Sequence, residues 1–243
     1  MFMFRFALLL AVTLMGCHPS SEVATPSLPD VPGVSTSIEA IPTNALPTWA
    51  APDHYQLTLW IDPDSKHFRG DATVTMRLTE PSNHLWLHAR GLEQLQMRVE
   101  TENGEQLDTE PRTLDQHGLV RLALPKQLAP QRLKVQAHYK VPFHSAPDSI
   151  HQRQQDGQTY ARARLENFNI SRILPSFDEA QYRVPLTLTL MVPPGMEVAA
   201  SMQPIKRQHL AGWLHLQFAP IVPTPNYRFA FVVAPSRASS LLP

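Results

Sequence analysis

The sequence contains one cysteine and nine glycines in 243 residues, and its charges balance, with 21 lysines and arginines against 21 aspartates and glutamates. A single cysteine excludes an internal disulfide and a zinc site built from cysteines. Zero net charge provides no basic excess for non-specific binding to a phosphate backbone, so we expect no nucleic acid partner. The apolar share of 43% is nevertheless too high for a wholly disordered chain.

Long hydrophobic runs are also missing, because the one apolar stretch, near the N-terminus, has about ten residues where a membrane-spanning helix needs about 20. It follows Arg5 and ends in Leu14-Met15-Gly16-Cys17, which resembles the lipobox of bacterial lipoproteins. We predict a signal peptide over residues 1–16, cleavage before Cys17, and lipidation of Cys17. The alternative is an ordinary signal peptide with a chance cysteine.

Lipidation would anchor the chain stably, because each buried acyl methylene contributes roughly 0.8 kcal/mol. The expected location is the bacterial cell envelope, with the membrane as partner. His18 stands where an aspartate would retain a lipoprotein at the inner membrane, which favours the outer membrane, facing the periplasm. Residues 17–47 hold six of the 24 prolines and predict an extended tether. A β domain is expected over residues 48–235 and a tail over 236–243.

From Trp49 onward, apolar residues alternate with polar ones at the two-residue period of half-buried strands. No window of 12 or more residues shows a helical face. The fold class expected is therefore all-β, with antiparallel sheets forming a sandwich or a saddle. Asn103-Gly104 fits a type I′ hairpin turn, and Gly70 within a strand pattern suggests a bulge. The alternation covers, among others, residues 54–62, 71–79, 133–141, 185–192, 209–218 and 227–233.

Several landmarks occur in an order that resembles the N-terminal β domain of the aminopeptidase N family of zinc metallopeptidases. They are PDHYQLTL from Pro52, FRG from Phe68, LWLHA from Leu85 and RILPSFDEA from Arg172. The resemblance covers roughly residues 49–233 and implies that fold. Ala180 stands where the family usually has proline. The resemblance implies a structural role for the signature residues Pro175, Phe177, Asp178 and Glu179.

The chemistry of that family depends on motifs that this sequence lacks. Zinc is bound there by HExxH on a helix, and none of the 11 histidines here is followed by glutamate. His84 and His88 have the right spacing, but on a strand their Cβ atoms would lie about 13 Å apart. Gly195-Met196-Glu197 only imitates the family's GxMEN, and we interpret residues 193–195 as a turn. We expect no metal site, no cofactor, no catalytic residue and no activity from this chain alone, because zinc belongs to the catalytic domain.

One functional residue of the family maps onto this chain, nine residues before the signature Pro175. The resemblance implies that Glu166 helps to hold the α-ammonium group of a peptide substrate, by charge-assisted hydrogen bonds. The alternative is a solvated loop carboxylate that pairs with Arg162 or Arg164. Adjacent carboxylates such as Asp178 and Glu179 point apart in a turn, so we expect them to bind the backbone amides of the turn or to pair with Arg172 or Arg183.

Three functions remain open at this level. The chain is a stand-alone binding or remnant module on a lipoprotein, whose partner is a peptide or a protein. Alternatively, it is the first part of a zinc aminopeptidase whose catalytic part is on another chain or lost. Finally, it is an unrelated β-sandwich lipoprotein of the envelope.

Overall fold

The computed structural model describes residues 41–143, 149–165, 169–222 and 229–236, so the signal peptide and Cys17 lie outside the described residues. Within those ranges the chain forms fourteen strands and one short 3-10 helix, η1, and no α-helix, which confirms the all-β prediction. The elements are β1 Ala50–Trp60, β2 His67–Leu78, β3 Ser82–His88, β4 Glu93–Thr101, β5 Gln106–Thr113, β6 Leu119–Leu128, β7 Gln131–Pro142, β8 His151–Gln155, β9 Gln158–Leu165, η1 Ile170–Arg172, β10 Leu186–Val192, β11 Met196–Ala200, β12 Pro204–Leu210, β13 Trp213–Phe218 and β14 Phe229–Pro235.

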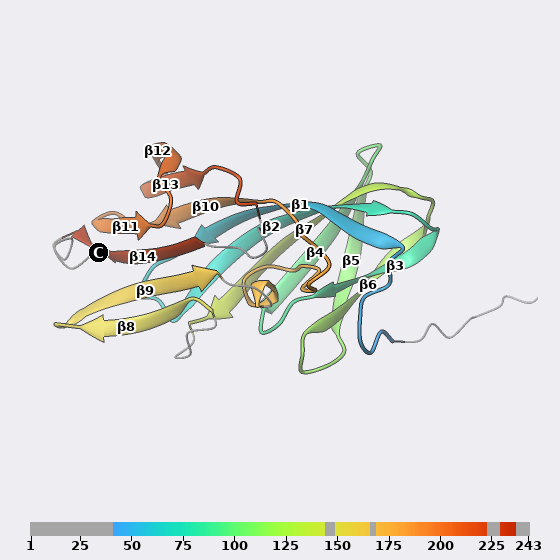
Figure 1. Cartoon of the computed structure of the whole chain (residues 1–243), viewed down its shortest axis with the longest axis horizontal. Helices are drawn as coiled ribbons and strands as arrows, with labels where there is room; N and C mark the ends of the chain where they lie inside the picture. Colours follow the sequence, from blue (N-terminus) through green and yellow to red (C-terminus); the bar gives the residue numbers. More distant parts are fainter. Residues whose placement is uncertain (1–40, 144–148, 166–168, 223–228, 237–243) are drawn as a thin grey trace, which may run out of the picture. The chain divides into compact units, whose positions relative to one another are not determined.

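The strands form one large sheet and one small sheet (Figure 1). The large sheet has ten strands in the order β12-β13-β10-β1-β2-β7-β4-β5-β6-β3, and the small sheet has four in the order β11-β14-β9-β8. Neighbours are antiparallel, with one exception, since β1 and β10 run parallel. The prediction of antiparallel sheets is wrong for this pair. A long crossover through the other strands returns the chain to β1 in the same direction, as parallel pairing requires.

The predicted alternation places every second side chain of each central strand in the core. In β1, Leu57 and Leu59 are buried while Gln56 is exposed, and β2 and β7 alternate in the same way. Such burial contributes roughly 1.5–3 kcal/mol for each large apolar side chain, which fixes the register of each strand. A shift by one residue would move the whole apolar row to the solvent.

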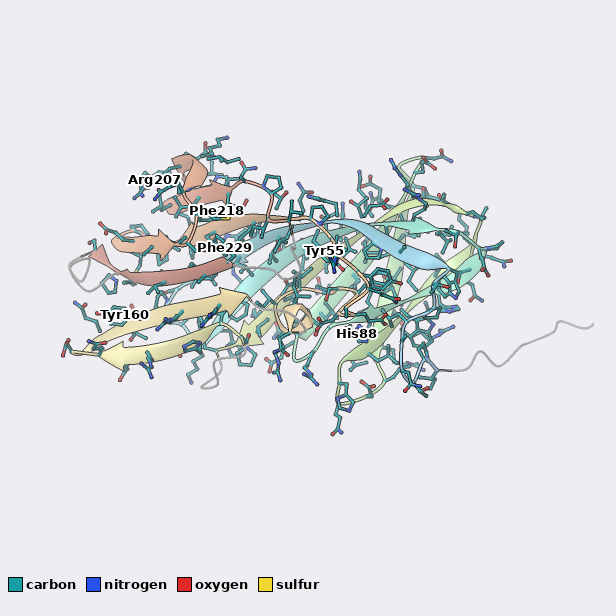
Figure 2. The ribbon with its side chains drawn as sticks, in the orientation of Figure 1. Tyr55, His88, Tyr160, Arg207, Phe218 and Phe229 are labelled. Carbon is teal, nitrogen blue, oxygen red and sulfur yellow. The ribbon has the colours of Figure 1, made fainter. Side chains whose placement is uncertain are left out.

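The small sheet packs against the large sheet through aromatic rings. The ring of Phe218 on β13 lies 5.0 Å from that of Phe229 on β14, edge to face (Figure 2). The side chain of Gln152 on β8 also donates hydrogen bonds to the carbonyls of Pro63 and Ser65, beyond the end of β1. These contacts hold two layers of sheet around a shared core.

Two predicted turn features differ in the structure. In the β4–β5 hairpin, three residues lie between Thr101 and Glu105, which share a backbone hydrogen bond; of these, Gly104 has a φ of 82° and Asn103 has no positive φ. This is a type I turn followed by a left-handed glycine rather than a type I′ turn, because only one position needs positive φ. Gly70 is not at a bulge, because it keeps register with both Leu59 and Tyr139.

The predicted turn at residues 193–195 is confirmed. The amide of Met196 donates to the carbonyl of Pro193 at 3.3 Å, and Gly195 has a φ of 79°. Met196 then begins β11, which pairs with β14 in the small sheet. The GMEV sequence therefore ends this turn and begins β11, and it has no helical context.

Candidate functional site

The signature segment 172–180 is held by hydrogen bonds from three strands of the large sheet. His88 at the end of β3 exchanges two backbone hydrogen bonds with Ser176, at 2.8 and 2.9 Å. The hydroxyl of Tyr55 on β1 accepts a hydrogen bond from the Phe177 amide at 2.9 Å (Figure 2). The hydroxyl of Tyr139 on β7 donates to a carbonyl near the start of the segment, that of Ile173. The segment therefore joins strands that are distant in sequence.

The signature side chains take part in packing and local hydrogen bonds. Pro175 and Phe177 are buried, and the Phe177 ring lies 5.2 Å from that of Tyr182. Asp178 accepts hydrogen bonds from the hydroxyl of Ser171, at 2.6 Å, and from its amide, at 3.3 Å. These contacts fix the turn that follows η1.

The second signature carboxylate, Glu179, faces a different part of the chain. One of its oxygens accepts the amide of Leu46, and the other accepts the side-chain amide of Gln181 at 2.6 Å. Asp178 and Glu179 thus bind separate groups of donors, both of which include backbone amides. This arrangement organises the backbone and does not bring the two carboxylates to one point for acid–base chemistry.

His88 has an unusual electrostatic environment. Its Nδ1 atom accepts a hydrogen bond from the Asp178 amide at 3.3 Å, so the ring proton lies on Nε2. Burial lowers the pKa of His88 below its usual value of 6.5, against the opposing effect of Asp178 and Glu179. The ring is therefore a neutral acceptor that holds the signature segment.

His84 and His88 do not form the core of a metal site. The His84 ring lies between Trp49 and Trp86, with centroids 5.3 and 5.7 Å away, and its Nδ1 atom is 2.8 Å from the side-chain oxygen of Asn83. Across the described ranges, no three histidine, cysteine, aspartate or glutamate side chains are grouped to hold a metal ion. The zinc ion that the resemblance implies for the family does not fit the residues described here.

A row of cations lies on one face of the β8–β9 hairpin. Along β9, Arg162 and Arg164 are exposed, and the alanines that alternate with them are buried. His151 pairs opposite Arg162, and Arg153 pairs opposite Tyr160, so these side chains share the face. The sequence prediction missed this surface and named two of the arginines only as partners of Glu166. The alternation Tyr-Ala-Arg-Ala-Arg over residues 160–164 would have predicted a strand with its arginines on one exposed face.

Glu166 itself lies outside the described residues, directly after the last residue of β9, Leu165. Its predicted contact with a peptide α-ammonium therefore stays a prediction. Among the residues that the structure describes, no helix is long and apolar enough to cross a membrane.

Comparison with known proteins places most of the chain in a described family. The model of the peptidase M1 N-terminal domain matches residues 51–228, which is more than half of the chain. Among curated proteins, aminopeptidase Q of Mus musculus is 23% identical over 247 aligned positions, which cover 87% of this chain and 44% of that protein. The chain thus spans less than half the length of this relative.

Proposed function

The chain belongs to the family of peptidase M1 N-terminal domains, and we propose that it is a binding module of that family, not itself catalytic, tethered to a membrane through Cys17. The match over residues 51–228 carries the proposal, together with a sequence in which no histidine is followed by glutamate. The HExxH pair of zinc ligands and its general base are therefore missing from these 243 residues. The family match also excludes an unrelated β-sandwich.

The cationic face of β8–β9 is the surface we assign to the partner. Arg153, Arg162 and Arg164 are exposed there, and the face bears three guanidinium groups that suit carboxylates bidentately. Glu166, next in sequence after β9, supplies the opposite charge for an ammonium group. A polypeptide partner with acidic groups beside a free amino terminus satisfies both.

A second candidate function is favoured by the length of the relative. The chain covers 44% of aminopeptidase Q, and the family match ends before the last strand, β14. We propose as the alternative that this domain is the N-terminal part of a zinc aminopeptidase whose catalytic part is on another chain or lost. Glu166 would then contribute to that active site by resemblance, and the zinc ligands would come from the partner.

The catalytic question is tested with the purified chain, by measuring bound zinc and the hydrolysis of aminoacyl chromogenic substrates. We expect no stoichiometric zinc and no hydrolysis, because the chain has no HExxH. Zinc-dependent hydrolysis by the pure chain would overturn the proposal. If a protein encoded beside this one contains HExxH, mixing the two tests the alternative. Activity that appears only in the mixture, and falls in the Glu166→Ala variant, would support a two-chain enzyme.

The tether is tested separately in cells. The predicted lipobox and the proline-rich residues 17–47 support an anchor at Cys17. The Cys17→Ser variant should leave the membrane fraction and lose acyl labelling, while the control Ser20→Ala should keep both. Acyl labelling of the Cys17→Ser chain would contradict the proposal. Density fractionation of the wild-type chain then tests the outer membrane location that His18 favours.

A further inference from the structure

A hollow of about 310 Å³ opens on the face of the large sheet opposite the core, where β1, β2, β7 and β4 are adjacent. This volume is at the lower end of the range for small-molecule sites. Most of the residues that line it alternate with buried neighbours, as Arg69 does with Phe68, whereas Tyr139 is itself buried. Its lining comprises Trp60, Arg69, Asp71, Gln94, Gln96, His138, Tyr139 and Lys140.

Two cations lie side by side in the lining of this hollow. Arg69 on β2 and Lys140 on β7 are direct partners in the antiparallel register, and both are exposed. Like charges in this position destabilise a sheet. Among the described residues, no ion pair joins either cation to a carboxylate. The Arg69 guanidinium instead lies over the Trp60 ring, 5.5 Å from its centroid.

The carboxylates nearest in register are already engaged. Glu93 is opposite Lys140 across β4 and β7, but its oxygen lies 3.5 Å from Nε2 of His67. Asp71 is in the hollow, and its oxygen is 2.6 Å from Nδ1 of its cross-strand partner His138. Both carboxylates thus lie beside the cations, but among the described residues neither forms an ion pair with Arg69 or Lys140.

The backbone of β4, which borders the hollow, is distorted. Gln94 has a φ of 50°, a conformation that residues other than glycine rarely adopt. The β4–β7 register also shifts between Glu93 and Gln96, so this stretch of β4 is bulged. Bulges re-aim side chains and occur often beside binding sites, and such strain persists where the surroundings impose it. Here the bulge places two glutamine side chains, those of Gln94 and Gln96, in the lining.

We propose that this hollow binds the carboxylate or phosphate group of a small molecule. Arg69 and Lys140 supply the opposing charge, and the side-chain amides of Gln94 and Gln96 donate further hydrogen bonds. A bound oxyanion would reduce the repulsion between the two cations that are paired in register. The Asp71 carboxylate, held by His138, limits the anionic part of the ligand to one compact group.

The first test titrates the full chain with inorganic phosphate and, separately, with succinate. Binding is measured by calorimetry and by the chemical shifts of backbone amides. We expect saturable binding of at least one, weakened by salt, with shifts confined to the ends of β2, β4 and β7 around Arg69, Gln94 and Lys140. Saturation by phosphate alone assigns a phosphate ligand, and saturation by succinate alone assigns a carboxylate. Absence of saturation with both, or shifts elsewhere, would overturn the proposal.

The second test uses variants matched in chemistry and exposure. Arg69→Gln and Lys140→Gln should each weaken binding by at least about tenfold, because each removes a charge-assisted contact. The control Arg98→Gln lies on β4 and removes a cation that is already paired with Asp108 at 2.9 Å, so affinity should not change. Equal losses in all three variants would mean a general charge effect and would refute the site. Both site variants should unfold at the same or higher temperature than wild type, since a like-charge pair is lost.

Discussion

Gly70 on β2 and Tyr139 on β7 are direct cross-strand partners, and the Tyr139 ring occupies the space where a side chain on Gly70 would begin. A Cβ atom built on Gly70 would lie 2.3 Å from the ring. The ring can therefore lie across β2 and direct its hydroxyl to the carbonyl of Ile173. The missing side chain at position 70 thus sets the position of the segment that carries the family signature.

The Gly70→Ala substitution should destabilise the protein by about 1–3 kcal/mol, the usual cost of overpacking a core. Alanine would gain less than this from its smaller entropy in the unfolded chain, about 0.4–1 kcal/mol. Gly70 does not have a positive φ, so the effect is steric and not conformational. Urea denaturation of both proteins measures the difference in the free energy of unfolding.

A double-mutant cycle identifies the ring as the cause. In a Tyr139→Leu background, Gly70→Ala should cost distinctly less, because the ring that collides with the new methyl group is gone. Equal costs in both backgrounds would show that Gly70 is needed for another reason.

The all-β class and the strand faces were predictable because burial of one face imposes a two-residue period. Leu57 and Leu59 show this in β1, and Val135 and Ala137 show it in β7. The family signature was predictable as a pattern of residue types. The direction of β10 beside β1 was not, because alternation is the same in parallel and antiparallel strands.

The contacts of the candidate sites could not be derived from the sequence, because they join residues that are distant along the chain. The hydrogen bond between Phe177 and Tyr55 spans 122 positions, and that between Asp178 and His88 spans 90. Gly70 was correctly recognised as an unusual residue within a strand, but its interpretation as a bulge was wrong. Glycine in a strand indicates either a bulge or a close approach, and only the position of Tyr139 decides between them.

The Tyr55→Phe substitution should lower the free energy of unfolding by about 1–3 kcal/mol, the cost of leaving a buried donor unpaired. The donor is the amide of Phe177, which is 2.9 Å from the Tyr55 hydroxyl. Tyr160→Phe is the matched control, since the Tyr160 hydroxyl has a long 3.4 Å contact with Gln158 on a half-buried strand. Chemical denaturation of the two variants should give a clear loss for the first and almost none for the second.

Acidification should destabilise the signature segment through His88. Its pKa in the folded state is below the usual 6.5, chiefly because of burial, so the unfolded chain takes up this proton first. The contribution is therefore fully present above pH 6.5, decreases as the pH falls below 6.5, and levels off below the folded pKa. In urea denaturation measured from pH 8 to pH 5, the midpoint concentration should stay constant above pH 6.5 and decrease below it.

The His88→Asn variant separates this effect from other titrating groups. An asparagine oxygen can accept the same Asp178 amide without titrating, so the fall between pH 6.5 and pH 5 should be smaller than in wild type. An unchanged pH profile would assign the acid sensitivity to other groups and contradict a role for His88.

The end of the proposed tether should contribute to the stability of the domain, although its composition is typical of a linker. Leu46 is only 3% exposed, and its amide donates to Glu179, whereas Ile41 is 56% exposed. Leu46→Ala should cost about 2–5 kcal/mol, as expected for truncating a buried leucine, and Ile41→Ala should cost almost nothing. Similar small losses in both variants would show that the chain before Trp49 only passes over the surface. A large loss at Leu46 alone would show that the last residues before Trp49 belong to the domain core and support the signature segment at Glu179.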